Sequence, residues 1–258
     1  MIGLQASNRG FARSVYEYNN LKGRCMTRST HSRFGIAAIF ALVILVNYLS
    51  NALPINGITM SQMSAKYSTL FTPAGFTFAI WGVIYLALFG FVIFQAMPSQ
   101  KDSQKIARIT VPFIVNGVAN AAWIVVWHYD MIMLAFGIML VILGSLIVIY
   151  RRLREGTATR TLLERIFLFL PFSLYLAWIT AATIANFSIL QVDLGLESFG
   201  LSELNWTYLK LAVAAAIGTI MLLRGGDIAF ILVIAWAAFG IASKQAGTPL
   251  ISGAATIL

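Results

Sequence analysis

Long apolar segments alternate along the chain with short polar ones, and each apolar segment is long enough to cross a membrane. At about 1.5 Å per residue, roughly 20 apolar residues span the hydrocarbon core of a bilayer. The pattern predicts seven spans, with the last residues lying at the membrane interface rather than forming a further span. The predicted spans are 34–53, 73–96, 106–127, 131–150, 162–190, 204–223 and 228–243, followed by the interfacial segment 244–258.

Composition supports a membrane protein. Of 258 residues, 59% are hydrophobic and 10% are charged, whereas a soluble domain carries about 25% charged residues. The sequence therefore predicts an all-α integral membrane protein. The single cysteine, Cys25, cannot form an internal disulfide or a CxxC metal site.

The net charge of +9 would fit a nucleic-acid-binding protein, but the basic residues lie mainly in connecting segments. Basic residues collect in the cytoplasmic loops of membrane proteins. A cytoplasmic N-terminus places fifteen of the 18 lysines and arginines on one side, in 1–33, 97–108, 151–165 and at Arg224. We expect a cytoplasmic N-terminus, a C-terminus on the opposite side, the lipid bilayer as a partner, and no nucleic acid. A bacterial inner membrane or a thylakoid fits this arrangement, with another organelle membrane as the alternative.

The basic segment 1–33 has three interpretations. It is a cytoplasmic tail that orients the first span, a Ser- and Arg-rich transit segment, or an overlong start preceding a natural initiator at Met26. The sequence leaves all three open.

The second predicted span has an aromatic face. Thr72 and Pro73 are expected to begin this helix, Thr72 as its cap and Pro73 in its first turn. Aromatic residues then recur at helical spacing, which places them on one side of the helix. They are Phe78, Trp81, Tyr85 and Phe89.

The centres of the predicted spans contain no ionisable residue, since His128, Asp130, Lys210 and Asp227 are expected at helix ends. Proton pumps, ion-coupled carriers and intramembrane proteases need ionisable groups at depth. The sequence therefore predicts no catalytic set and no metal site, and argues against an enzyme. His128 is expected to be an interfacial turn residue, with haem ligation as the alternative.

Amides and tryptophans replace charges inside the spans. Asn116 and Asn120 lie on the third span and Asn186 on the fifth, and each needs a partner because an unsatisfied amide in hydrocarbon is costly. They either bond neighbouring helices together or, with Trp123 and Trp178 on the same stripes, line a shared cavity. Tight aromatic packing is the alternative to a cavity.

Three motifs resemble the TspO/MBR family, the tryptophan-rich sensory or translocator proteins. The second span begins Thr72-Pro-Ala-Gly-Phe-Thr-Phe-Ala-Ile-Trp81 and continues to Tyr85. The third contains Asn120-Ala-Ala-Trp123, similar to the family's Asn-x-x-Trp. The fifth contains Tyr175-Leu-Ala-Trp178-Ile-Thr-Ala-Ala182-Thr183-Ile-Ala-Asn186, similar to Tyr-x-x-Trp-x-x-x-Ala-Thr-x-x-Asn.

The resemblance implies a TspO-like five-helix bundle over residues 34–190, with 191–258 as a two-helix extension. It also implies a cavity between the helices that binds porphyrins or other flat lipophilic molecules, covered by the loop 54–72. The implied lining residues, with Tyr85 added from its helical spacing, are Trp81, Tyr85, Asn120, Trp123, Tyr175, Trp178, Ala182 and Asn186.

The sequence departs from the family pattern at several positions. Ala74 stands in place of a second proline, Phe76 in place of a common tryptophan, and Pro171 lies four residues before Tyr175. The fifth span also lacks a closing Tyr followed by Lys or Arg, which argues against sterol binding.

Two functions follow. The first is a receptor, sensor or carrier for a tetrapyrrole such as a porphyrin, haem or a chlorophyll-like pigment. The second is an accessory subunit that docks through its extra helices into a larger membrane complex, for example a photosynthetic one. Enzymatic breakdown of a porphyrin stays open as a further alternative. A homodimer is compatible with either function.

Overall fold

A computed structural model describes residues 30–67, 69–155, 160–196 and 200–256. Within these ranges every long element is a helix. The predicted tail 1–33 lies mostly outside the described residues. In chain order the elements are α2 (Thr30–Ala52), α3 (Met60–Lys66), η1 (Gly75–Ala79), α4 (Ile80–Ala96), η2 (Pro98–Gln100), α5 (Gln104–His128), α6 (Ile132–Arg154), α7 (Leu162–Glu164), η3 (Arg165–Phe169), α8 (Leu170–Asp193), α9 (Glu203–Gly225), α10 (Ile228–Lys244) and α11 (Pro249–Thr256).

Six helical segments in the described ranges are long and apolar enough to cross a membrane, and α10 is a shorter apolar helix of 17 residues. All seven coincide with predicted spans. The prediction of an all-α membrane protein with about seven spans is therefore confirmed. The segment after α10 forms only the eight-residue helix α11, which is too short to cross a bilayer.

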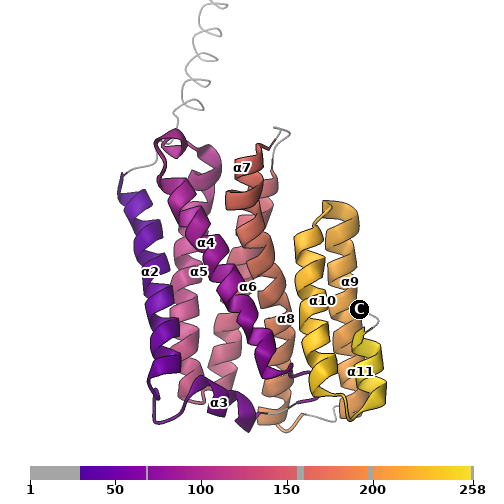
Figure 1. Cartoon of the computed structure of the whole chain (residues 1–258). Coiled ribbons are helices and arrows are strands. Elements are labelled where there is room, and N and C mark those ends of the chain that lie inside the picture. Colours follow the sequence, from indigo (N-terminus) through magenta and orange to yellow (C-terminus); the bar gives the residue numbers. More distant parts are fainter. Residues whose placement is uncertain (1–29, 68, 156–159, 197–199, 257–258) are drawn as a thin grey trace, which may run out of the picture.

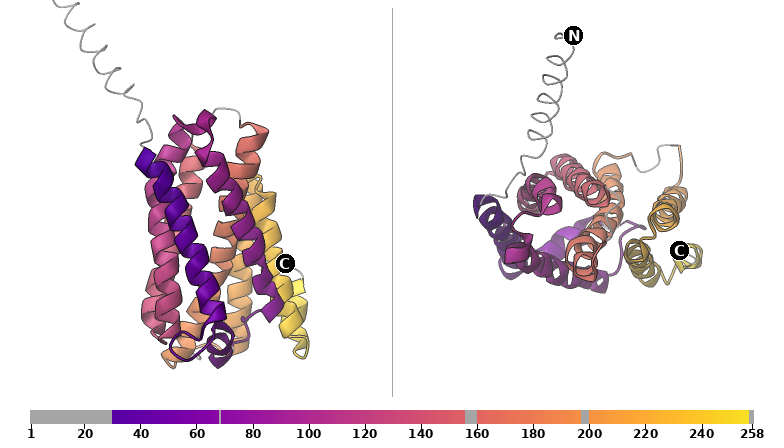
Figure 2. Two further views of the ribbon diagram at one scale, coloured as in Figure 1. Left: turned by 60° about the vertical axis from the view of Figure 1, so that its left-hand side comes forward. Right: turned by 90° about the horizontal axis from the view of Figure 1, so that it is seen from above.

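Five of the segments form a closed bundle around a central axis (Figures 1 and 2). Following the bundle around, α2 packs against α5, α5 against α6, α6 against α8, α8 against α4, and α4 again against α2. Side chains that point inward from these helices therefore meet along the axis. This is the arrangement in which stripes on different helices can line one site.

The last three helices lie outside this bundle. α9 and α10 pair with each other and pack against α8, and α10 also contacts η1 at the start of the second span. α11 turns back along both of them, where Ile251 and Ala255 are buried with Phe71, Leu211 and Ile241.

The second span begins differently from the prediction. Thr72 does not cap a helix, because its hydroxyl oxygen accepts a hydrogen bond from the backbone N–H of Thr69. The chain stays extended at Ala74, whose N–H donates to the carbonyl of Gly240 at 2.9 Å, and then enters the tight helical turns of η1. The contact with α10 takes the place of the expected cap.

The fifth span is continuous from Leu162 to Asp193 but contains one wide helical turn, η3. α8 begins at Leu170, directly after this turn, and Pro171 is its second residue. Proline lacks an N–H and its ring crowds the preceding turn, so a locally widened helix accommodates it.

Candidate functional site

Aromatic side chains from α4 and α8 meet inside the five-helix bundle. Trp81 stacks on Tyr85 with ring centroids 5.1 Å apart, and its edge meets Tyr175 at 5.6 Å and Trp178 at 6.4 Å. Phe78 also contacts Trp178 edge to face, at 5.8 Å. Tyr175 and Trp178 are each only 3% exposed. The predicted stripes of the second and fifth spans thus form one aromatic cluster.

An amide relay joins α5 to this cluster. The Asn47 amide donates to the Asn120 carbonyl oxygen at 3.1 Å, and the Asn120 amide donates to the Tyr175 hydroxyl at 3.0 Å. Three helices, α2, α5 and α8, are bonded in this way. The Tyr175 hydroxyl accepts at the end of the relay and keeps its own hydrogen for another acceptor.

Several polar atoms of the cluster and of the neighbouring α5 stripe are buried without a hydrogen-bond partner among the described residues. They are the Tyr85 hydroxyl and the indole nitrogens of Trp123 and Trp127. The two indoles stack on each other at 5.3 Å. Because an unmade hydrogen bond in a buried site costs about 1–3 kcal/mol, these donors favour a ligand that brings acceptor atoms.

Not every predicted lining residue joins this cluster. Asn186 donates to the carbonyl of Ala182 on its own helix at 2.9 Å, and Ala182 packs against the apolar core. Asn116 bonds α6 instead, through the carbonyl of Ile142 at 3.2 Å and the hydroxyl of Ser145 at 3.0 Å. Asn116 therefore bonds α5 to α6, the first of the two roles expected of the amides, while it also borders the cavity between α2, α4 and α5.

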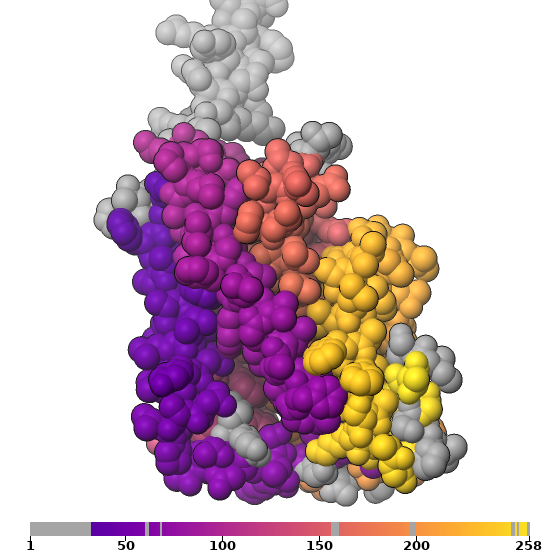
Figure 3. Space-filling model, viewed as in Figure 1, coloured from indigo at the N-terminus to yellow at the C-terminus, as the bar shows by residue number. Residues whose placement is uncertain are grey.

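A narrow cavity lies between α2, α4 and α5. It holds about 290 Å³ of empty space, open solvent included, and its walls include Phe40, Tyr85, Asn116, Gly117 and Tyr175. Figure 3 shows the surface hollowed between α2 and α4, above α3. Phe40 stacks on Phe89 at 6.4 Å and holds these two helices together.

Two contributors from the first span were not predicted. Phe40 and Asn47 both face the site from α2. Asn47 carried a usable signal, because an amide within an apolar span needs an internal partner. Phe40 carried none, since one phenylalanine in an apolar run is indistinguishable from its lipid-facing neighbours.

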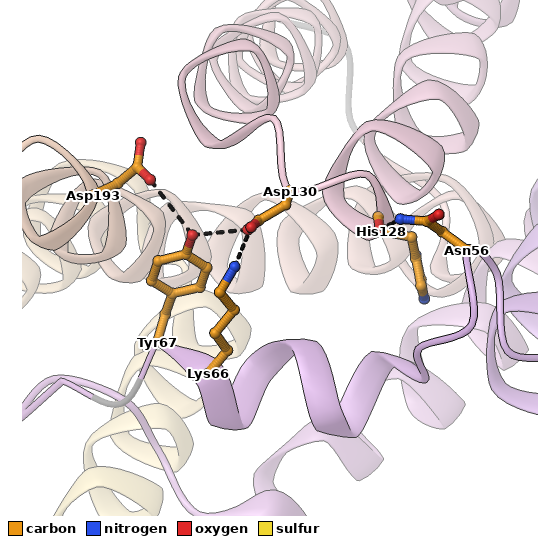
Figure 4. Close-up of polar contacts among 6 residues, drawn as sticks. All are labelled: Asn56, Lys66, Tyr67, His128, Asp130 and Asp193. Atoms are coloured by element: carbon orange, nitrogen blue, oxygen red, sulfur yellow. Dashed lines mark hydrogen bonds and ion pairs between the residues drawn. The ribbon is translucent and has the colours of Figure 1, made fainter.

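The segment predicted to cover the cavity crosses the end of the bundle, with α3 packed against α5 (Figure 4). Lys66 pairs with Asp130, and the Tyr67 hydroxyl donates to Asp130 at 2.8 Å and lies 3.4 Å from Asp193. On the other side of α3, the Asn56 amide donates to the backbone carbonyl of His128 at 3.2 Å. We call the contacts among Lys66, Tyr67, Asp130 and Asp193 the lid latch.

The lid latch favours the charged forms of its ion pair. The hydrogen bond to Asp130 raises the pKa of Lys66. Burial opposes the charge on Asp130, but hydrogen bonds from Lys66 and Tyr67 outweigh it and lower the Asp130 pKa. Burial, followed by the hydrogen bond to Asp130, raises the pKa of Tyr67 to about 12. The latch therefore keeps its charges across the neutral range.

Three of the four residues expected at watery helix ends, His128, Lys210 and Asp227, are buried. His128 is 1% exposed, its Nδ1 lies 2.7 Å from the carbonyl of Ile124, and its Nε2 has no partner in the described ranges. Lys210 lies two turns into α9 and is 9% exposed, with its ammonium 5.8 Å from the rings of Phe187 and Trp206. His128 ends α5, as expected, but the segment before α3 covers it through the contact of Asn56 with its carbonyl. Lys210 lies inside α9 and is enclosed by aromatic rings. The described residues contain no group of three or more potential metal ligands.

Comparison with known proteins agrees with this geometry. A sequence model of a family described as TSPO-like protein matches residues 34–258, and this match includes α9 to α11. Searches of curated proteins and of solved structures gave no match. Because the family match covers most of the chain and the structure is a helical membrane bundle, this chain belongs to the TSPO-like protein family.

Proposed function

We propose that the protein binds a flat lipophilic ligand, with a tetrapyrrole such as a porphyrin as the leading candidate, between the helices of its five-helix bundle. The observation that carries the proposal is the aromatic cluster of Trp81, Tyr85, Tyr175 and Trp178 beside buried donors that lack partners. Receptor, sensor and carrier functions all require such a site.

The chemistry of the cluster suits this ligand class. Flat aromatic walls favour a flat apolar molecule, and a few oriented polar groups fix its position. The Tyr85 hydroxyl and the Trp123 and Trp127 indoles, which have no partner in the part of the chain that the structure describes, match acceptors such as the carboxylates of a porphyrin. The enclosed space between these helices has room for about one water molecule, so binding a macrocycle requires α2 and α4 to separate at the Phe40–Phe89 contact.

We also propose the orientation expected from the charges, with the N-terminus cytoplasmic and the C-terminus on the opposite side, in a bacterial inner membrane or a thylakoid. Arg33, Lys101 and Lys105 lie at the same end of the bundle as the arginines after α6. This end is cytoplasmic under the positive-inside rule, and the lid then faces the opposite side.

Titration of the purified chain with protoporphyrin tests the proposal. Trp81→Ala and Trp178→Ala each remove one wall of the cluster, and we expect each to weaken binding about tenfold, which corresponds to about 1.4 kcal/mol. Trp206→Ala is the matched control, because Trp206 contacts Phe187 between α8 and α9, outside the bundle interior. Quenching of tryptophan fluorescence and the Soret absorption band report binding.

If Trp81→Ala, Trp178→Ala and Trp206→Ala proteins bind protoporphyrin as tightly as the unmodified chain, the ligand does not lie in this cluster. Absence of any protoporphyrin binding by folded protein excludes the tetrapyrrole assignment.

A further inference from the structure

One end of the molecule carries the arginines that end α6, and we call it the basic end. At this end the hairpin of α9 and α10 stops short of α7. Figures 1 and 3 show the turn between these helices lying lower than α7, so that a step forms beside the bundle. Two contacts of Arg154 place this turn against α6: its Nη1 donates to the carbonyl of Gly225 at 2.8 Å, and its Nη2 lies 3.5 Å from Asp227.

Three arginines lie in the part of the chain that runs from the end of α6 to the start of η3, above this step. Arg154 ends α6, while Arg160 and Arg165 flank the short helix α7. Arg160 is held by an aromatic ring rather than by an acid, with its guanidinium carbon 4.1 Å from the centre of the Phe169 ring. Burial, followed by the positive charges of Arg154 and Arg165, lowers the pKa of Arg160.

The acids nearby do not neutralise this cluster. Asp227 accepts hydrogen bonds from the hydroxyls of Tyr150 at 2.7 Å and Ser173 at 2.6 Å and from the backbone N–H of Phe230 at 3.1 Å. Glu164 is paired with Lys105 at 2.6 Å. The Nε atom of Arg154 is buried and has no partner among the described residues. The three acids nearest these arginines in the described chain, Asp227, Glu164 and Glu155, are therefore each bonded to other groups, Glu155 through Arg108 at 3.7 Å.

We propose that Arg154, Arg160 and Arg165 bind the phosphate of an anionic phospholipid whose acyl chains lie over the short α9–α10 hairpin. Arginine clusters bind phosphate through charge-assisted hydrogen bonds, which are stronger than neutral ones. Basic pockets between membrane helices on one leaflet are typical sites for anionic headgroups. The step supplies the space, and the apolar residues Leu223 and Ile228 beside it are 78% and 63% exposed for contact with the chains.

Binding of phosphatidylglycerol to the full chain in detergent, counted by native mass spectrometry, tests this site. We expect the unmodified protein to retain phosphatidylglycerol in preference to phosphatidylcholine. Arg160→Gln/Arg165→Gln protein should bind phosphatidylglycerol roughly 30-fold more weakly, because each basic group near a membrane surface strengthens anionic lipid binding about fivefold. Arg154 is left unchanged because it also holds the hairpin. Arg160→Lys/Arg165→Lys protein keeps both charges and should retain much of the affinity.

The matched control is Arg33→Gln/Lys101→Gln, which removes two charges from the same end but from α2 and from the connection between α4 and α5. The inference is overturned if this control loses phosphatidylglycerol as strongly as the Arg160/Arg165 variant, since binding then depends on overall charge. It is also overturned if inorganic phosphate alone raises Tm as much as phosphatidylglycerol does. Should the glutamine variant fail to fold, the comparison of phosphatidylglycerol, phosphatidylcholine and inorganic phosphate on the unmodified chain decides the question.

Discussion

The contact between Thr77 and Gly240 leaves no room for a methyl group. A Cβ atom added at Gly240 would lie 2.0 Å from the Thr77 hydroxyl oxygen and 2.9 Å from its Cβ. Thr77 is fully buried, and the neighbouring backbone is fixed by the hydrogen bond from Ala74 to Gly240. Glycine at this position allows η1 to lie directly on α10.

We therefore predict that Gly240→Ala destabilises the protein by about 1–3 kcal/mol, the usual cost of overpacking a close contact. The effect should appear as a lower Tm in detergent. Gly144→Ala is the matched control, because Gly144 also lies inside a helix but has open space around it. There alanine is neutral or stabilises by up to about 1 kcal/mol. Equal Tm values for the two variants would contradict the close contact.

The residues of the aromatic cluster were predictable to different degrees. Trp81 and Trp178 could be predicted because they break the expectation that tryptophan lies at the interface, and Tyr175 because it shares the helical stripe and the motif of Trp178. Asn186 lies on the same stripe, but its amide satisfies itself within one turn. The sequence shows that an amide needs a partner and cannot show whether that partner is local or distant.

At the scale of elements, the lid latch depends on one charged pair and on Tyr67. Asp130 has a lowered pKa, so its contribution to lid closure is fully present above its ordinary value near 3.8 and is lost as the pH falls through the lowered value. Lys66 has a raised pKa, so its contribution is present below 10.5 and is lost as the pH rises through the raised value. Lid closure should be constant between about pH 5 and 9.

We predict that acid below about pH 4 opens the lid, and that Asp130→Asn opens it at pH 7 as well. The expected change in the opening equilibrium is roughly two- to fivefold, because exposed ion pairs contribute little. Hydrogen exchange of the α3 backbone, corrected for the intrinsic rate at each pH, measures this opening. Asp102→Asn, the same change at an exposed residue elsewhere, is the control. A pH response that persists in Asp130→Asn protein would assign it to another group.

The positions of the helices could be predicted within a few residues, but their local irregularities could not. Apolar length and bounding polar residues fixed each span, since both are properties of the segment itself. The tight turns of η1 and the wide turn of η3 depend on a neighbouring helix and on Pro171. Such features follow from contacts between segments that are far apart in the sequence.

At the scale of the whole molecule, the C-terminal hairpin supports the bundle at both ends. Near the lid, the Trp236 indole donates to the carbonyl of Thr77 at 2.9 Å. At the basic end, Asp227 bonds Tyr150 and Ser173 on two bundle helices. Asp227 was predicted to lie in a turn near water, but it is buried. A sequence shows the length of each helix but does not show how deep in the molecule a short hairpin ends. The family match through residue 258 agrees with this integration.

We predict that a chain ending at Leu196 has a lower Tm and binds protoporphyrin about tenfold more weakly, a loss of about 1.4 kcal/mol. In a bilayer, helices associate through packing and specific hydrogen bonds rather than through a hydrophobic driving force. Loss of α10 removes the packing against η1 and the hydrogen bond from Trp236 to Thr77. η1 carries Phe78 and is followed directly by α4, which carries Trp81. The cluster should therefore loosen even though none of its own residues has been removed.

Trp236→Phe separates this effect from a general loss of stability, because it removes only the hydrogen bond to Thr77 and keeps an aromatic ring against Phe76. It should weaken protoporphyrin binding less than the deletion does and leave the basic end unchanged. If instead the shortened chain keeps its Tm and its affinity but loses proteins that co-purify with the full chain, residues 197–258 act as a docking segment. That outcome would favour the accessory-subunit function over an integral part in ligand binding, because the bundle would then hold its site without the hairpin.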